Sequence, residues 1–364
     1  MTERLTDDRV ARNIAAVTLL TSGDRLAQEG NIEAALTEYQ RVVELEATSL
    51  DADTKLYLAI ALRARTTGLL AIGRVDDACR ELNILRELIK RHGDQELRPE
   101  AAHAIVVTAA HFAKGDSDGS RDSAILLWGD AAALLDDTVA PAQRTLRFQS
   151  LGDRAMLLVE RERYTEAVDG NRSLLDEIGD PFDMPLLLTR AIAELSLARA
   201  SEGLMLLENA RQGYVSLARK YAQTSTVEVA DVAAQALWRC ANSYLLDRRP
   251  HLAYAYYSAL TDRYADPRSA SVRATLGAAE LGARMLRDGV DRGDEGLLMV
   301  AMCEHARWSD ENGRESTAET ERAHIAALQA RLVREARSVE VDVDVASIAG
   351  EVQPIYAEWS PIVP

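Results

Sequence analysis

The side chains most able to do chemistry in this sequence are its few histidines and cysteines. His103 and His111 are eight residues apart on a predicted helix, about 80° apart around its axis. A helical zinc enzyme uses an i, i+4 pair on one face, so these two are interpreted as surface or groove histidines. Cys303, Glu304 and His305 offer metal-ligand atoms, but a helix points the cysteine and the histidine to different sides. We therefore expect neither a metal nor another cofactor.

Acidic pairs are the other candidates for chemistry. Asp76 with Asp77 and Asp136 with Asp137 stand near predicted helix ends, and neither pair extends into the spaced aspartates that bind magnesium diphosphate in helical isoprenoid enzymes. The sequence has no glycine-rich phosphate loop, no Gly-x-Ser-x-Gly elbow and no His-Glu-x-x-His. Aromatic residues, which line the sugar sites of helical glycosidases, make up only 5% of the chain. The sequence predicts a protein that is not an enzyme.

Net charge and cysteine content limit which class of partner the protein can bind and which cell compartment it can occupy. The net charge of −16 disfavours nucleic acid, because duplex binding depends on clustered lysine and arginine. A neutral or basic protein is the more compatible partner. Cys79, Cys240 and Cys303 are odd in number and lie in apolar helical stretches, which favours free thiols in a reducing compartment. No apolar run reaches the ~18 residues that span a bilayer, and the charged N-terminus is unlike a signal peptide. We expect no membrane insertion and a bacterial cytoplasmic protein.

Long helices are the elements that must position any site. Alanine and aliphatic residues dominate, and only 9 prolines occur in 364 residues, which is an all-α composition. One stretch shows how two helices pair, with large, small and large residues on the first helix, a glycine elbow, and a small then an aromatic residue on the second. Its positions are Leu19, Gly23, Leu26, Gly30, Ala35 and Tyr39. The small residues allow the helices to approach closely, and the large ones fill the space between them.

This pattern resembles the tetratricopeptide repeat (TPR). It recurs in residues 62–82, 151–167 and 237–257, and the predicted elbows lie near residues 30, 73, 116, 163, 202, 249 and 292. The fifth elbow is placed at Ser201 to Gly203. The period of about 43 residues exceeds the ~34 of the standard repeat, as in long-helix TPR variants. The resemblance implies a right-handed α-α superhelix of about seven helical hairpins over residues 6–312, followed by a C-terminal capping helix over 315–338.

The resemblance also implies a binding groove, because the first helix of each TPR hairpin lines the concave face. The motif places there Leu20, Asp24, Arg63, Thr67, Met156, Glu160, Trp238, Arg239, Asn242 and Leu245. Arg239 and Asn242, beside Trp238, could hold a peptide main chain and one of its side chains. Alternatively, Trp238 packs between repeats and Arg239 meets a neighbouring acid. Both interpretations stay open.

The last 26 residues, Val339–Pro364, abandon the helical pattern. They contain five acidic residues and no lysine or arginine, and Val339 begins an alternating run typical of an extended strand. Apolar anchors follow at Ile355, Tyr356, Trp359 and Ile362. This extended tail is predicted either to cap the last helix of its own array or to dock on a partner or a second copy of the chain, which would form a homo-oligomer.

The predicted function is that of a non-enzymatic scaffold or adaptor, which binds a peptide or protein in the concave groove and through the tail. The alternative is a sensor subunit that responds to a peptide or protein signal and controls a separate effector chain. The effector would be separate because Met1 to Glu29 is too short to form an effector domain.

Overall fold

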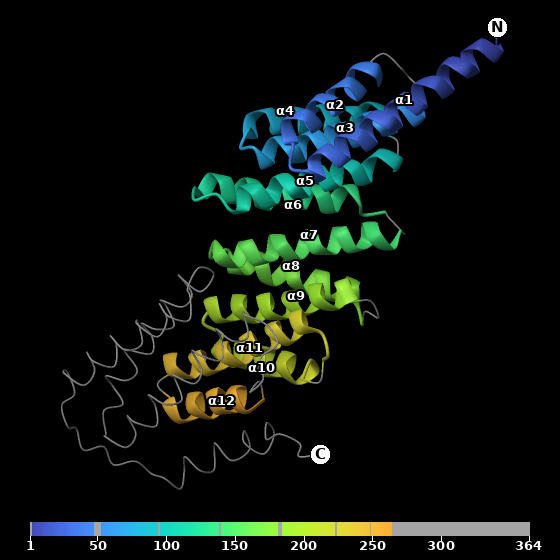
Figure 1. The fold of residues 1–364 in the computed structure, drawn as a ribbon. Helices are drawn as coiled ribbons and strands as arrows, with labels where there is room; N and C mark the ends of the chain where they lie inside the picture. Colours follow the sequence, from blue (N-terminus) through green and yellow to red (C-terminus); the bar gives the residue numbers. More distant parts are fainter. Residues whose placement is uncertain are drawn as a thin grey trace, which may run out of the picture. The chain divides into compact units, whose positions relative to one another are not determined.

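The computed structural model describes residues 2–46, 52–93, 95–137, 140–180, 184–222, 224–247 and 249–263. Within these ranges the chain forms twelve α-helices and one short 3-10 helix, with no β-strand (Figure 1). The all-α prediction is therefore confirmed for this part of the chain. The predicted seventh hairpin, the helix 315–338 and the tail 339–364 lie outside the described residues.

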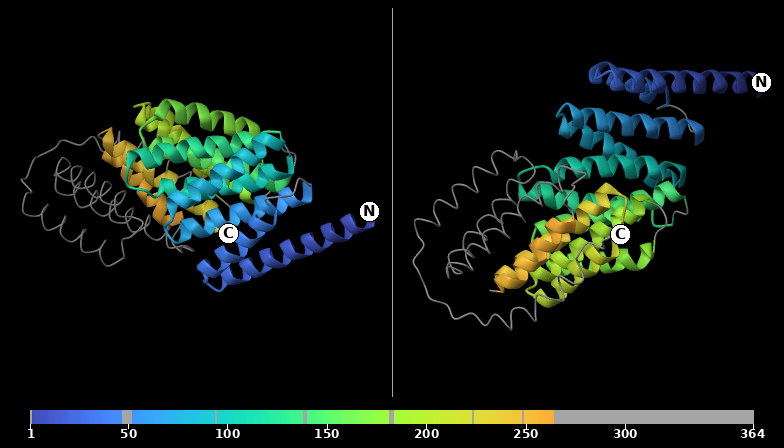
Figure 2. Two further views of the ribbon diagram at one scale, coloured as in Figure 1. Left: turned by 90° about the horizontal axis from the view of Figure 1, so that it is seen from above. Right: turned by 60° about the horizontal axis from the view of Figure 1, so that its bottom comes forward.

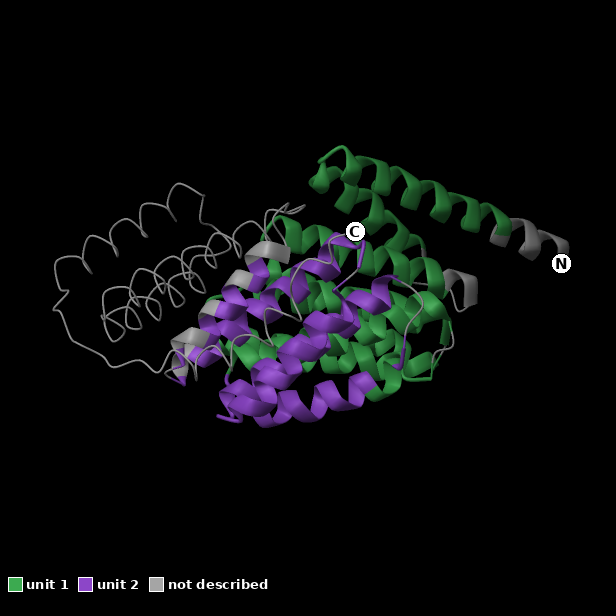
Figure 3. Cartoon of the chain, turned by 90° about the horizontal axis from the view of Figure 1, so that it is seen from below, with its two compact units in different colours: residues 1–161, 176–178 green, residues 162–175, 179–364 purple. Residues whose placement is uncertain are grey.

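The chain divides into two compact units, coloured separately in Figure 3. Unit 1 comprises residues 1–161 and 176–178, and unit 2 comprises residues 162–175 and 179–364. The helices of unit 1 are α1 (Thr2–Gln28), α2 (Ile32–Glu46), α3 (Ala52–Ala71), α4 (Val75–His92), α5 (Arg98–Ala113), α6 (Asp118–Leu134) and α7 (Pro141–Glu160), with the 3-10 helix η1 (Gln95–Leu97) before α5. Helix α8 (Tyr164–Ile178) ends in residues assigned to unit 1.

Packing in unit 1 follows one scheme. Helix α1 packs on α2, α3 on α4 and α5 on α6, while each odd-numbered helix from α1 to α5 also packs on the next odd-numbered one. Figure 2 shows that the N-terminal part of the 27-residue α1 extends beyond the 15-residue α2. The odd-numbered helices therefore form a continuous row, and side chains from neighbouring members of that row can meet.

The first hairpin shows why its two helices lie so close. A Cβ added at Gly23 would lie 2.5 Å from Cε1 of Tyr39, so only glycine leaves room for the ring. The Tyr39 hydroxyl donates to Oδ1 of Asp24 at 2.7 Å, and Ala35 is 1% exposed. The predicted roles of Gly23, Ala35 and Tyr39 at the helix interface are confirmed.

The first two elbows share one hydrogen-bond pattern. At the first elbow the N–H of Gly30 donates to the carbonyl three residues back (3.0 Å), and the N–H of Asn31 donates five residues back (2.9 Å). Gly73 and Arg74 repeat both bonds at the second elbow. Gly30 and Gly73 have φ values of +79° and +75°, the left-handed conformation that favours glycine.

The fifth elbow keeps this pattern without glycine, and its predicted position was wrong by about three residues. Helix α9 runs through Gly203, and the turn is formed by Leu204, Met205 and Leu206, with Met205 left-handed at φ 61°. Gly203 instead lies at a close helix contact: a Cβ there would lie 2.3 Å from the ring of Tyr164, so the ring would have to move. The glycine marks a close contact between helices rather than the turn itself.

Unit 2 continues with α9 (Met184–Gly203), α10 (Leu207–Lys220), α11 (Val227–Leu246) and α12 (Pro250–Arg263). Each packs on the next, and α9 also packs on α11. Asn171 of α8 donates to Oγ of Ser196 on α9 at 3.0 Å. The buried guanidinium of Arg211 on α10 pairs with Asp247 at 3.0 Å and donates to the carbonyl of Ser243 at 2.8 Å, which ties α10 to the end of α11.

Candidate partner-binding groove

A pocket of about 200 Å³ opens between α1 and α3, with α2 as its floor. Asp24 from α1 and Arg63 and Thr67 from α3 all line it. These three positions, predicted from two separate motif copies, are brought together in one place. Most of the other lining residues are small or apolar, and include Ala27, Ile32, Ala35, Leu36, Ala64 and Gly68. We call this the groove pocket.

The polar side chains of the groove pocket are held by neighbours. Arg63 Nε lies 2.5 Å from Oε2 of Glu100 on α5, so the row of odd-numbered helices is linked across this face. The Tyr39 hydroxyl donates to Asp24, and burial together with that carboxylate raises the pKa of Tyr39. Its phenol therefore remains a hydrogen-bond donor at neutral pH. Thr67 is exposed, and its hydroxyl donates to the carbonyl of Arg63 at 3.1 Å.

His103 extends the polar surface along α5, where His111 also lies, as predicted. Partial desolvation lowers the pKa of His103, and the positive charge of Arg63 lowers it further, while Glu100 acts in the opposite direction. The imidazole is therefore neutral at pH 7. The sequence did not predict that Glu100 and His103 lie near Arg63, because the third hairpin gives no match to the motif.

The other groove positions predicted in unit 1 do not line this pocket. Leu20 is 7% exposed and packs in an apolar cluster with Ala16 and Tyr39, so it offers little surface. On α7, Met156 is half-buried and Glu160 is exposed.

Trp238, Arg239 and Asn242 lie on α11 in unit 2. Trp238 is 8% exposed within the apolar cluster of this unit, and the guanidinium of Arg239 lies 5.8 Å from the Trp238 ring. Oδ1 of Asn242 accepts a hydrogen bond from the Tyr257 hydroxyl. Trp238 thus packs largely inside the unit. The side chain of Leu245 and residues Tyr356 and Trp359 lie outside what the structure describes.

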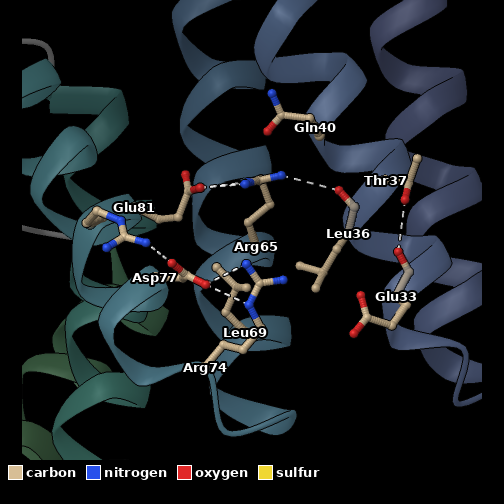
Figure 4. A pocket seen from close by; sticks show the side chains of 10 residues that line it. Glu33, Leu36, Thr37, Gln40, Arg65, Leu69, Arg74, Asp77 and Glu81 are labelled. Atoms are coloured by element: carbon tan, nitrogen blue, oxygen red, sulfur yellow. Dashed lines mark hydrogen bonds and ion pairs between the residues drawn. The ribbon is translucent and has the colours of Figure 1, made fainter.

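A second pocket, of about 480 Å³, lies between α2, α3 and α4 (Figure 4). Arg65 at its centre pairs with Glu81 at 2.6 Å and donates to the carbonyl of Leu36 at 3.3 Å. Asp77 pairs both with Arg74, the residue before α4, and with Arg80 of α4. Arg65 and Glu81 are only 16% and 13% exposed, so a largely buried ion pair joins α3 to α4 in this pocket. The hydrogen bond from Arg65 to Leu36 links both helices to α2.

The chemistry-bearing residues are spread out. Among the described residues, no group of three or more His, Cys, Asp or Glu side chains could hold a metal ion. Cys79 and Cys240 are free thiols, and burial raises the pKa of both. Asp76 lies in the first turn of α4, and Asp136 pairs with Arg147 at 2.7 Å. The predicted cluster at residues 303–305 lies outside the described part of the chain.

None of the helices in the described ranges combines the length and the apolar character needed to cross a bilayer. No protein-family model matches this chain, and a search of curated proteins finds no match either.

Proposed function

We propose that this chain is a non-enzymatic, TPR-like interaction module of the cytoplasm, acting as a scaffold or adaptor. It binds an extended segment of a protein partner in the groove lined by the odd-numbered helices of unit 1. The observation that carries this proposal is the groove pocket, in which Asp24, Arg63 and Thr67 from two successive hairpins meet at one solvent-open cavity.

Repetition of local geometry supports the TPR-like part of the proposal. In the first hairpin the Tyr39 hydroxyl donates to Asp24, and in the sixth the Tyr257 hydroxyl donates to Asn242, each across 15 residues. A second local feature, the pair of elbow hydrogen bonds, recurs at the first, second and fifth elbows. Recurrence of such local features favours a superhelical array, since each unit of such an array contacts mainly its neighbours.

The protonation states of Tyr39 in the pocket and of His103 near Arg63 favour recognition over proton transfer. Tyr39 has a raised pKa and His103 a lowered one, so neither changes charge at neutral pH. Arg63 is already paired with Glu100. Groups with fixed protonation suit a site that presents donors and acceptors to a bound segment.

Two exposed threonines provide a matched test. Thr67 lines the groove pocket, and Thr37 lines the pocket between α2 and α4. Each hydroxyl donates a hydrogen bond to the carbonyl four residues back, at 3.1 Å for Thr67 and 3.0 Å for Thr37.

The experiment compares peptide binding by two variants. A library of random dodecapeptides displayed on phage is selected against the purified chain, and one enriched peptide is titrated. Thr67→Trp should fill the groove pocket and weaken binding by more than tenfold, while Thr37→Trp should leave it unchanged.

Equal binding by both variants, with unchanged helical circular dichroism, would place the peptide elsewhere and contradict the proposal. A selection that enriches no peptide would contradict it as well.

A further inference from the structure

We propose that the groove pocket takes one aliphatic side chain of a linear segment in which a neighbouring residue is lysine or arginine, paired with Asp24. This inference rests on the proposed function and names the class of sequence that the groove would select.

The size of the pocket points to a single side chain. Small-molecule and cofactor sites usually occupy about 300–1,000 Å³, whereas the groove pocket holds about 200 Å³. Its inner wall is formed by side chains such as Ala64, Leu36 and Ile32, which offer no hydrogen bonds. Burial of an aliphatic group there is favourable at about 25 cal/mol per Å² of apolar surface removed from water.

The charge at the rim determines what can lie beside that side chain. The positive charge of Arg63 is compensated by Glu100 at 2.5 Å. Asp24 is exposed, and its Oδ1 accepts from Tyr39, while Oδ2 has no hydrogen-bond partner among the described residues. The rim therefore presents a carboxylate that has no ion pair within the described ranges, in a chain whose net charge is −16. A cationic residue next to the anchor complements it, and an acidic residue would be repelled.

The chain itself contains the control for this charge. Asn242 occupies in the sixth hairpin the position that Asp24 occupies in the first, and it accepts the same tyrosine hydroxyl bond. An amide at this position is thus compatible with the hairpin. Asp24→Asn removes the negative charge, keeps the acceptor for Tyr39 and should leave the fold intact.

The experiment uses the full chain and the displayed dodecapeptide library. The enriched peptides should contain lysine or arginine within about three residues of Leu, Ile, Val or Met. A fluorescent copy of one of them should bind Asp24→Asn about threefold to tenfold more weakly than wild type, which corresponds to loss of a partly exposed ion pair. The difference between the two proteins should shrink at 0.5 M salt because of screening.

The outcomes separate this inference from the function on which it rests. Enriched peptides that are blocked by Thr67→Trp but lack basic residues, or that bind Asp24→Asn as tightly as wild type, would overturn the inference and leave the groove as the binding site. Peptides insensitive to Thr67→Trp would overturn both. Loss of helical circular dichroism in Asp24→Asn would overturn the equivalence with Asn242, and Asp24→Ser then repeats the measurement.

Discussion

Helices α1 and α2 approach closely at Gly23, and this contact can be tested with Gly23→Ala. The substitution has two opposing effects on stability. In an open helix, replacing glycine with alanine stabilises by about 1 kcal/mol. Here the new Cβ would lie 2.5, 2.8 and 2.9 Å from three ring atoms of Tyr39, distances that real Cβ atoms essentially never show. The ring cannot easily rotate away, because its hydroxyl is bonded to Asp24.

The expected net effect follows from these two terms. Overpacking a core contact costs about 1–3 kcal/mol, and the upper half of that range applies because a whole ring face is in the way. After subtraction of the propensity gain, Gly23→Ala should lose about 1–2 kcal/mol. Gly170→Ala is the matched control, since a Cβ at this helical glycine meets nothing within 4 Å. It should gain about 0.5–1 kcal/mol.

Hydrogen–deuterium exchange is the appropriate assay, because packed helical hairpins can open locally. Gly23→Ala should speed exchange in α1 and α2 and leave α11 and α12 unchanged. In the double variant Gly23→Ala with Tyr39→Leu the clash disappears, so the two costs should be less than additive by about 1 kcal/mol. If Gly23→Ala slows exchange as Gly170→Ala does, the reasoning about the helix interface is wrong.

Three further predictions concern strain, charge and pH. Met205→Gly should raise stability by about 1 kcal/mol in thermal denaturation, because it relieves a left-handed residue that is 75% exposed, and a lower Tm would show that the side chain makes a needed contact. Arg65→Ala should lower the free energy of unfolding, measured in urea, by about 2–3 kcal/mol because it leaves Glu81 without its cation. Adding Glu81→Gln should restore part of the loss, and no recovery would contradict the pairing. Because the pKa of His103 is lowered in the folded chain, the unfolded chain binds more protons than the folded one as the pH falls below about 6.5. The free energy of unfolding should therefore decline there, and His103→Asn should flatten the decline. An unchanged pH profile in that variant would show that His103 does not cause it.

The hairpin architecture could be predicted where the residue types in a stretch are compatible with only one structural role. Gly23 followed by Ala35 and Tyr39 has few interpretations other than two closely packed helices, and the structure shows that contact. Gly203 was ambiguous, because glycine serves both left-handed turns and close contacts. Its contact partner Tyr164 lies on another hairpin, and Met205 is an unusual residue for the turn. Local sequence therefore misplaced the fifth elbow.

The groove was predictable only in part, for a similar reason. Asp24, Arg63 and Thr67 follow from their spacing to small residues on their own helices, and that spacing sets which way they face. The pairing of Arg63 with Glu100 depends on how α3 packs on α5, which no local pattern encodes. The burial of Trp238 likewise depends on neighbouring helices of unit 2 rather than on its position in the motif.

Asp24 and Asn242 together separate what the hairpin requires from what a partner would recognise. Both accept a tyrosine hydroxyl in the same way, so the hairpin needs a hydrogen-bond acceptor at this position, and either residue supplies it. A negative charge is not required for that bond, and an exposed carboxylate contributes little to folding. The charge of Asp24 is therefore free to serve recognition, and equivalent positions in two hairpins can differ in charge while both keep the tyrosine hydrogen bond. On this reasoning a basic segment should prefer the groove pocket of unit 1 to the corresponding surface around Asn242.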